Sequence, residues 1–161
     1  MHVTVTTLDF LKSCSASVRE IFAYWDGKRG DRKMPRRADI DPAEVRRLLP
    51  NILLVDVKWD PLDFVYRLVG TEEVAMRRAD PTGKRVEENT FGPSRDLVMA
   101  NYRAVAANGG LLYDPNSFTS LDGRYIRDES LFLPLSEDGQ RVSQILVYAY
   151  YRFAAPPPRP A

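Results

Sequence analysis

Few side chains in this sequence are of the types that act as nucleophiles, imidazole bases or soft metal ligands. The 161 residues contain one cysteine, Cys14, and one histidine, His2. A single thiol allows neither an intramolecular disulfide nor a multi-thiolate metal site. A histidine beside the N-terminus is poorly placed to activate a nucleophile, and one imidazole cannot support H-E-x-x-H zinc chemistry. The sequence therefore argues against most familiar catalytic constellations and predicts no metal site.

Paired carboxyl groups are the next candidates for chemistry, because two of them can act as general acid and general base. The adjacent acidic pairs are Glu72/Glu73, Glu87/Glu88 and Asp128/Glu129. Neighbouring residues of a strand point to opposite faces, so adjacency alone does not make two carboxyl groups converge. A small cavity-fold enzyme that uses tyrosine and acidic residues for proton transfer stays an alternative. Two converging carboxyl groups of shifted pKa in a pocket would favour it.

The strongest local charge feature is a basic run. Its members are Lys28, Arg29, Arg32, Lys33, Arg36, Arg37, Arg46 and Arg47. Guanidinium groups suit the phosphates of a nucleotide or of nucleic acid. However, aspartates interrupt the run, residues 28–47 contain no aromatic side chain for base stacking, and the net charge is only +1. We interpret the run as a solvated connector and expect no nucleic acid or membrane partner. A regulator that binds a phosphorylated nucleotide is the alternative.

Arg67 is the one charged residue in an apolar segment, between Tyr66 and Leu68. It is either exposed or buried beside a carboxylate, because an unpaired buried charge is very costly. A structural salt bridge is the main interpretation and an anion ligand is the alternative. The possible carboxylate partners are Asp56, Glu72 and Glu129.

The elements that must position these residues belong to an ordinary globular chain. Apolar residues make up 44% and charged residues 28%, and the length predicts one domain with a substantial core. The first ten residues have no signal-peptide pattern, and every apolar run is strand-sized. We therefore expect a soluble, cytoplasmic protein.

An amphipathic helix is predicted over Leu8 to Trp25, ending near Gly27, because its apolar residues recur at spacings of three and four. The helix either packs on its own domain or forms a dimer interface. An isolated coiled coil of this length would be marginal. The candidate dimer-interface residues are Leu11, Val18, Ile21, Phe22 and Trp25.

The rest of the chain predicts an α+β domain. Short helices are expected over 41–49 and 70–78, a longer helix over 93–107, and strands over 51–59, 64–69, 111–120, 124–135 and 141–153. Short, turn-rich connections indicate antiparallel pairing, and the order of elements gives one five-stranded sheet with helices on one face. The expected units are an N-terminal helix over 1–27, the domain over 28–153 and a mobile Pro-rich tail over 154–161. The tail could instead be a docking peptide.

This order of elements resembles a PAS domain. The resemblance is carried by PRRADIDPAEVRRLLPNILLVDV (35–57), FVYRLVGT (64–71), DPTGK (80–84) and LFLPLSEDG (131–139), which are similar to small stand-alone PAS proteins, mostly of α-proteobacteria. It covers about 25–153. It implies five antiparallel strands, helices inserted between the second and third, and frequent dimerisation through an N-terminal helix.

The resemblance also implies a ligand space between the sheet and the inserted helices. The candidate ligand-binding residues are Tyr66, Arg67, Met99, Tyr102 and Tyr113. Tyrosine combines an apolar ring with one directed hydroxyl, and methionine adapts to irregular shapes. The alternative is that these side chains simply fill the core.

Two cofactor chemistries are not expected from the resemblance. A histidine-ligated haem or a cysteinyl-flavin adduct needs its residue in the helical insertion, and residues 75–110 contain neither histidine nor cysteine. A neutral organic ligand, a non-covalently bound flavin or an empty core stay open.

The resemblance thus predicts a non-catalytic sensory or adaptor module with no output domain attached. Such a module would act in trans as a homodimer or through a protein partner. A ligand or partner would shift the population of arrangements of the N-terminal helix against the sheet.

Overall fold

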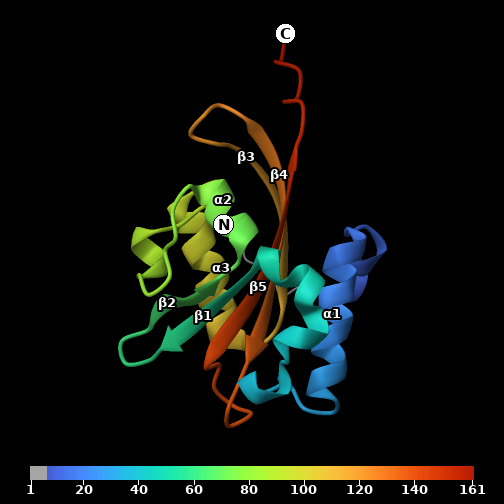
Figure 1. Cartoon of the computed structure of the whole chain (residues 1–161), viewed down its shortest axis with the longest axis vertical. Helices are drawn as coiled ribbons and strands as arrows, with labels where there is room; N and C mark the ends of the chain where they lie inside the picture. Colours follow the sequence, from blue (N-terminus) through green and yellow to red (C-terminus); the bar gives the residue numbers. More distant parts are fainter. Residues whose placement is uncertain (1–6) are drawn as a thin grey trace.

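The computed structural model describes residues 7–161, and its centre is one antiparallel sheet with the strand order β2-β1-β5-β4-β3 (Figure 1). His2 lies outside the described residues. The strands are β1 (Ile52–Lys58), β2 (Asp63–Val69), β3 (Leu112–Thr119), β4 (Tyr125–Leu135) and β5 (Gln144–Phe153). The helices are α1 (Ala16–Arg29), α2 (Thr71–Arg77) and α3 (Arg95–Asn108), with 3-10 segments η1 (Leu8–Lys12), η2 (Arg37–Asp39), η3 (Pro42–Asn51) and η4 (Val86–Glu88). The predicted α+β sheet is confirmed.

Helices cover both faces of this sheet. Figure 1 shows α1 on one side and α2 and α3 on the other. Strand β5 explains why both faces need cover: Ile145 and Val147 belong to the core under α3, while Leu146 and Tyr148 belong to the core under α1. A strand that is apolar on both faces must be buried on both. The inserted helices therefore lie on one face, as predicted, and the N-terminal helix packs on the opposite face.

The prediction of one continuous helix over 8–25 is wrong, because the structure has two separate helical segments there, η1 and α1. The helical path breaks between η1 and α1, where Ser15 is the extended N-cap of α1. Arg19 donates to the carbonyl of Leu11 from Nε at 3.2 Å and from Nη2 at 3.0 Å. Its side chain therefore provides the hydrogen bond that this carbonyl would accept from a backbone amide in a continuous helix. Helix α1 then runs through Gly27 and ends at Gly30, whose φ is 58°, so it crosses the expected unit boundary at residue 27.

The apolar face of α1 packs on its own domain. Val18, Ile21, Phe22 and Trp25 are buried in the core, and the Trp25 indole donates to the carbonyl of Pro134 in β4 at 3.0 Å. Leu11 is half-buried against the same core. This placement favours packing within the domain over a free dimerisation face, because these side chains already cover the sheet.

The edge strand β2 departs from the simple alternation that would place Phe64, Tyr66 and Leu68 on one face. The β1–β2 register pairs Leu54 with Leu68 and Val55 with Tyr66, so it steps over Arg67. This bulge leaves Phe64 and Tyr66 buried but exposes Leu68.

The C-terminal end of the chain carries no regular structure. Residues 154–161 have no helix or strand, and almost all of them are exposed. Within residues 7–161, no helix has the length and apolar character needed to cross a membrane.

Candidate functional site

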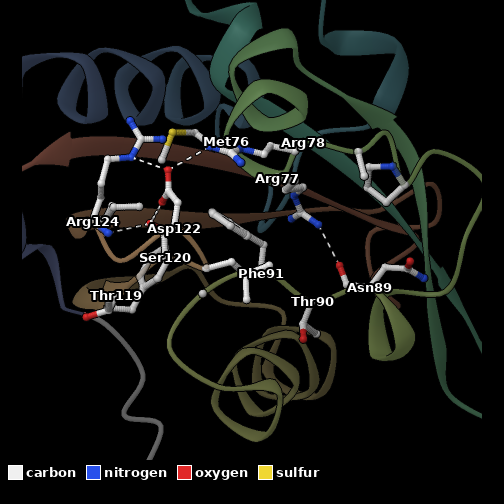
Figure 2. Close-up of a pocket in the computed structure, with 16 residues that line it drawn as sticks. Met76, Arg77, Arg78, Asn89, Thr90, Phe91, Thr119, Ser120, Asp122 and Arg124 are labelled. Atoms are coloured by element: carbon white, nitrogen blue, oxygen red, sulfur yellow. Dashed lines mark hydrogen bonds and ion pairs between the residues drawn. The ribbon is translucent and has the colours of Figure 1, made fainter.

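A cleft of about 440 Å³ opens between the end of α2, the loop 89–92 and the β3–β4 hairpin (Figure 2). It lies on the face of the sheet that carries the inserted helices. Helix α2 ends at Arg77, and the left-handed backbone of its C-cap Arg78 (φ 57°) turns the chain at the cleft. The hairpin contributes the opposite wall through Phe118, Asp122 and Arg124.

The rim of the cleft holds two arginines on one carboxylate. Arg78 Nη2 lies 2.9 Å and Arg124 Nε lies 2.8 Å from the same oxygen, Oδ2 of Asp122. The Ser120 hydroxyl donates to the other oxygen of Asp122. This hydrogen bond and the two guanidinium charges hold the pKa of Asp122 below its ordinary value. The Arg78–Asp122 pair joins α2 to the hairpin across the cleft mouth.

The floor of the cleft is aromatic. The ring of Phe91 contacts Phe118 edge to face with centroids 5.2 Å apart, and it contacts Tyr151 at 5.7 Å. The guanidinium of Arg77 lies 5.5 Å from the Phe91 centroid. Figure 2 shows Phe91 between the Asp122–Arg124 side of the cleft and Arg77. Phe91 therefore separates an exposed rim from a buried interior.

The interior contains an ion pair held by tyrosines. Arg77 Nε lies 2.9 Å from Glu73 Oε2, and both side chains are buried. The Tyr151 hydroxyl donates to Glu73 Oε1 at 2.5 Å, and Arg77 Nη1 donates to the Tyr66 hydroxyl at 3.1 Å and to the carbonyl of Asn89 at 2.8 Å. Burial by itself would lower the pKa of Arg77, but the charge of Glu73 raises it above its ordinary value. Burial, then the charge of Glu73, raises the pKa of Tyr151.

A second buried polar group lies behind the aromatic floor, around an internal cavity of about 30 Å³. Asn101 Nδ2 donates to Asp114 at 2.7 Å, and the Ser130 hydroxyl lies 2.9 Å from Asp128. Burial raises the pKa of Asp128 well above its ordinary value, and the Ser130 hydrogen bond opposes the rise. This cavity is far below the size of an organic-ligand pocket, so any such ligand on this face would occupy the outer cleft.

Three of the five candidate ligand-binding residues come together. Tyr66, Met99 and Tyr102 are buried in the core beneath α3. Tyr102 packs against Phe64 and Phe132 with centroids 5.4 and 5.1 Å apart. This packing favours the core-filling alternative for Met99 and Tyr102, whereas Tyr66 also reaches Arg77.

The other two candidates lie elsewhere. Tyr113 is on the opposite face, where its ring stacks on Phe10 at 4.8 Å and its hydroxyl donates to Glu129 Oε1 at 2.8 Å. Successive residues of a strand alternate, so Leu112 rather than Tyr113 faces α3.

Arg67 is exposed on β2. Two of the carboxylates proposed as its partners are engaged elsewhere: Asp56 accepts from Gln144, and Glu129 accepts from Ser15 and Tyr113. The third, Glu72, is exposed on α2. The exposed alternative for Arg67 therefore holds, and the structural salt bridge with these partners does not form.

The sequence does not single out several residues of this candidate site: Arg77, Phe91, Asp122, Arg124 and Tyr151. One signal was available: Glu73 and Arg77 are four residues apart on a predicted helix, which is the spacing of an ion pair. The dipeptide Asp122–Gly123 by itself indicates only a hairpin turn. Nothing local in the sequence indicates that Asp122 meets Arg78, 44 residues away.

The basic run does not converge on a site. Four of its eight members each pair with a nearby carboxylate: Lys28 with Glu44 and Arg32 with Asp39 at 2.9 Å, Arg29 with Asp26 at 2.7 Å, and Arg47 with Glu20. Within residues 7–161, no group of three or more histidine, cysteine or acidic side chains is arranged to hold a metal ion.

Comparison with known proteins gives a family match and a set of similar folds. The family model for the PAS domain matches residues 13–148. A light-oxygen-voltage domain from a study of a flavin analogue superposes with a TM-score of 0.53 at 11% identity, over 68% of this chain and 82% of that one. A light-oxygen-voltage protein of Rhodobacter sphaeroides gives 0.48 at 11% identity, over 70% and 68%. A PAS domain from Colwellia psychrerythraea gives 0.44 at 13% identity, over 71% and 98%. No curated protein matches the sequence.

Proposed function

The chain belongs to the PAS domain family, and from that premise we propose that it is a non-catalytic sensory or adaptor module that binds a small organic ligand in the outer cleft. PAS domains are generally sensory signalling modules. The observation that carries the proposal is the cleft itself. Its volume of about 440 Å³ is in the range of small-molecule sites, and it combines an aromatic floor with a few directed polar groups.

The cleft lies where a ligand could affect the buried network. Arg77 and Phe91 line both the outer cleft and the internal cavity. A ligand that moves Phe91 would therefore act on the Glu73–Arg77 pair and on Tyr151 of β5. Buried ion pairs tolerate few arrangements, because loss of one partner leaves a charge uncompensated. This favours a response by discrete rearrangement.

Strand β4 connects this face of the sheet to the N-terminal helix. Asp128 lies opposite Tyr151 in the β4–β5 register and lines the internal cavity. The next residue, Glu129, points to the other face and accepts a hydrogen bond from the Ser15 amide at 2.9 Å. A displacement of β4 would move Glu129 and so act on the N-cap of α1. This contact supports an output in which the N-terminal end of α1 changes its preferred arrangement.

The output is proposed to act in trans, in the cytoplasm, through a homodimer or a protein partner. PAS domains commonly mediate dimerisation and ligand binding. Because the apolar face of α1 already covers the sheet, the homodimer would use the exposed side of α1 or another surface.

The test is native mass spectrometry of gently purified protein together with its visible absorption spectrum. We expect a bound small molecule that dissociates on denaturation. The variant Ala79→Trp, which fills the cleft, should lose it, whereas Ala23→Trp on the exposed side of α1 should retain it. Wild-type protein that carries no small molecule, or equal retention by both variants, would overturn ligand binding in this cleft. A ligand-free dimer would then indicate a protein–protein adaptor.

A further inference from the structure

We propose that the outer cleft selects an amphipathic monoanion: a flat apolar body bearing one carboxylate or an equivalent acid group. The inference rests on the proposed function, because it names the class of ligand for the same site. Its grounds are the charge, the free donors and the apolar surface of the residues that line the cleft.

The charge of the lining is unbalanced. Arg77, Arg78 and Arg124 contribute three guanidinium groups, and Asp122 is the one carboxylate among the described residues that line the cleft. The charge of Arg77 is already matched by buried Glu73. The rim is left with Arg78 and Arg124 against Asp122, an excess of one positive charge. One acid group neutralises that excess, whereas a di- or triphosphate would add uncompensated negative charge beside Asp122.

The two arginines at the rim have N–H donors that Asp122 does not use. A guanidinium carries five N–H donors in a planar fork. Arg78 meets Asp122 through Nη2, and Arg124 meets it through Nε. The guanidinium carbon of Arg124 lies 4.3 Å from the centroid of the Phe153 ring, and this cation–π contact helps to hold the guanidinium in place. The remaining N–H groups suit two-point binding of a carboxylate, as arginine forks do elsewhere.

The apolar half of the site lies beside these donors. Phe91 and Phe118 form the floor, and Leu121 at the tip of the hairpin is fully exposed at the edge of the cleft. Covering an exposed leucine beside an aromatic floor with an apolar group is favourable, because it removes apolar surface from water. A flat ring system would contact Phe91, Phe118 and Leu121 while its acid group faces Arg78 and Arg124.

Asp122 occupies one donor of each rim arginine. Its carboxylate holds both arginines and ties α2 to the hairpin. A bound acid would take the remaining N–H groups of Arg78 and so weaken the hold of Arg78 on Asp122 and on the hairpin. The ligand class therefore also indicates how binding would loosen the cleft mouth.

The test compares two isosteric probes, 2-naphthoate and the neutral 2-naphthamide, by isothermal titration calorimetry on the full chain. We expect naphthoate to bind about tenfold more tightly than the amide, from charge-assisted hydrogen bonds to the rim. The double variant Arg78→Gln/Arg124→Gln should remove this preference, because it should weaken naphthoate binding far more than amide binding. Asp122→Asn should strengthen naphthoate binding, because it removes the negative charge that lies beside the bound acid group.

The control is Arg141→Gln, whose arginine stacks on Trp59 away from the cleft and should leave the preference intact. The substituted rim side chains are exposed, so the variants should keep the wild-type melting temperature. Equal binding of the two probes, or an unchanged preference for naphthoate in the double variant, would overturn the proposed anion selectivity. Neither result would contradict the proposed function. Binding of neither probe would overturn this inference as well. The proposed function is decided separately by the molecule retained on the wild-type protein.

Discussion

The carboxylate of Glu129 accepts a hydrogen bond from the backbone amide of Ser15, 2.9 Å away, so a side chain of the central sheet holds the first turn of the N-terminal helix. The same oxygen accepts the Tyr113 hydroxyl at 2.8 Å. The N-terminus of a helix favours negative charge, because its first amides lack partners within the helix. Glu129 therefore fixes where α1 begins and ties it to β4.

Glu129→Gln keeps an acceptor oxygen but removes the charge, so it should lower the free energy of unfolding by about 0.5–1.5 kcal/mol, roughly the difference between a charged and a neutral hydrogen bond. Urea denaturation measures this loss, and hydrogen exchange should show faster exchange at the start of α1. Glu137→Gln is the matched control, because Glu137 also accepts a backbone amide, that of Arg37 at 3.3 Å, but at an exposed position. Equal losses in the two variants would mean that the sheet contact adds nothing to the stability of α1.

The buried Glu73–Arg77 pair should be far more sensitive than the exposed ion pairs. Arg77→Met leaves Glu73 charged and uncompensated and should cost about 3–5 kcal/mol. The double variant Glu73→Gln/Arg77→Met removes both charges and should recover part of that loss. Thermal unfolding measures both, with each kcal/mol worth roughly 2–4 °C in a chain of this size.

The control for this pair is Arg85→Met, because exposed Arg85 contacts Asp63 and Glu88 and should cost at most about 1 kcal/mol. A double variant no more stable than Arg77→Met would show that the charge of Glu73 is not the source of the loss.

The sequence predicted the elements well because their periodicity is local. All five strands and the helices α2 and α3 lie within a few residues of their expected bounds. The break before α1 was missed because its cause is distant: Glu129, 114 residues away, supplies the acceptor that lets the helix restart at Ser15. The apolar spacing of three and four continues through the break and so does not reveal it.

The candidate site was harder to predict, because it depends on which face a side chain joins. Tyr113 was correctly placed in a strand, but a shift of one residue decides between the two faces, and both are apolar. The bulge at Arg67 similarly changes the phase of β2. The cleft joins α2 to the β3–β4 hairpin, and only the folded chain brings Arg78 to Asp122.

Ile21 should be a position where a charge unfolds the protein rather than dissociating a dimer. It is fully buried against the sheet, so Ile21→Glu places an unpaired charge in the core. We expect loss of the cooperative thermal transition. Ala23→Glu on the exposed side of the same helix should leave the transition unchanged. A folded, monomeric Ile21→Glu protein would instead assign this face of α1 to a dimer interface.

Gly70 is required by a close approach of two backbone segments. Its amide donates to the carbonyl of Ile52 at 2.8 Å, and a Cβ at this position would lie 2.4 Å from the carbonyl oxygen of Pro50. Gly70→Ala must therefore displace backbone and should cost about 1–3 kcal/mol or more. Gly27→Ala is the control, because a Cβ there has no atom within 4 Å. Equal melting temperatures for the two variants would contradict the close approach.

Asp128 should make the protein less stable as the pH rises. Burial raises its pKa in the folded state, so the folded protein keeps a proton that the unfolded chain releases near pH 4. Between these two pKa values the unfolded state binds fewer protons, and stability falls by up to about 1.4 kcal/mol per pH unit. Asp128→Asn should remove this slope and raise the melting temperature at pH 7.

Asp138 should have the opposite effect on the pH dependence of stability. Its carboxylate accepts the amides of Arg141 and Gln140 at 2.9 and 2.8 Å, and these hydrogen bonds lower its pKa. The stability that the Asp138 carboxylate adds to the folded protein is therefore present at neutral pH and lost as the pH falls through the pKa of Asp138 in the folded state. Asp138→Asn should remove this part of the loss of stability at acidic pH. Melting temperatures from pH 3 to pH 8 separate the two effects. Parallel profiles for wild type and Asp128→Asn above pH 4 would show that Asp128 is ionised in the folded protein, with its charge stabilised by Ser130 and its surroundings.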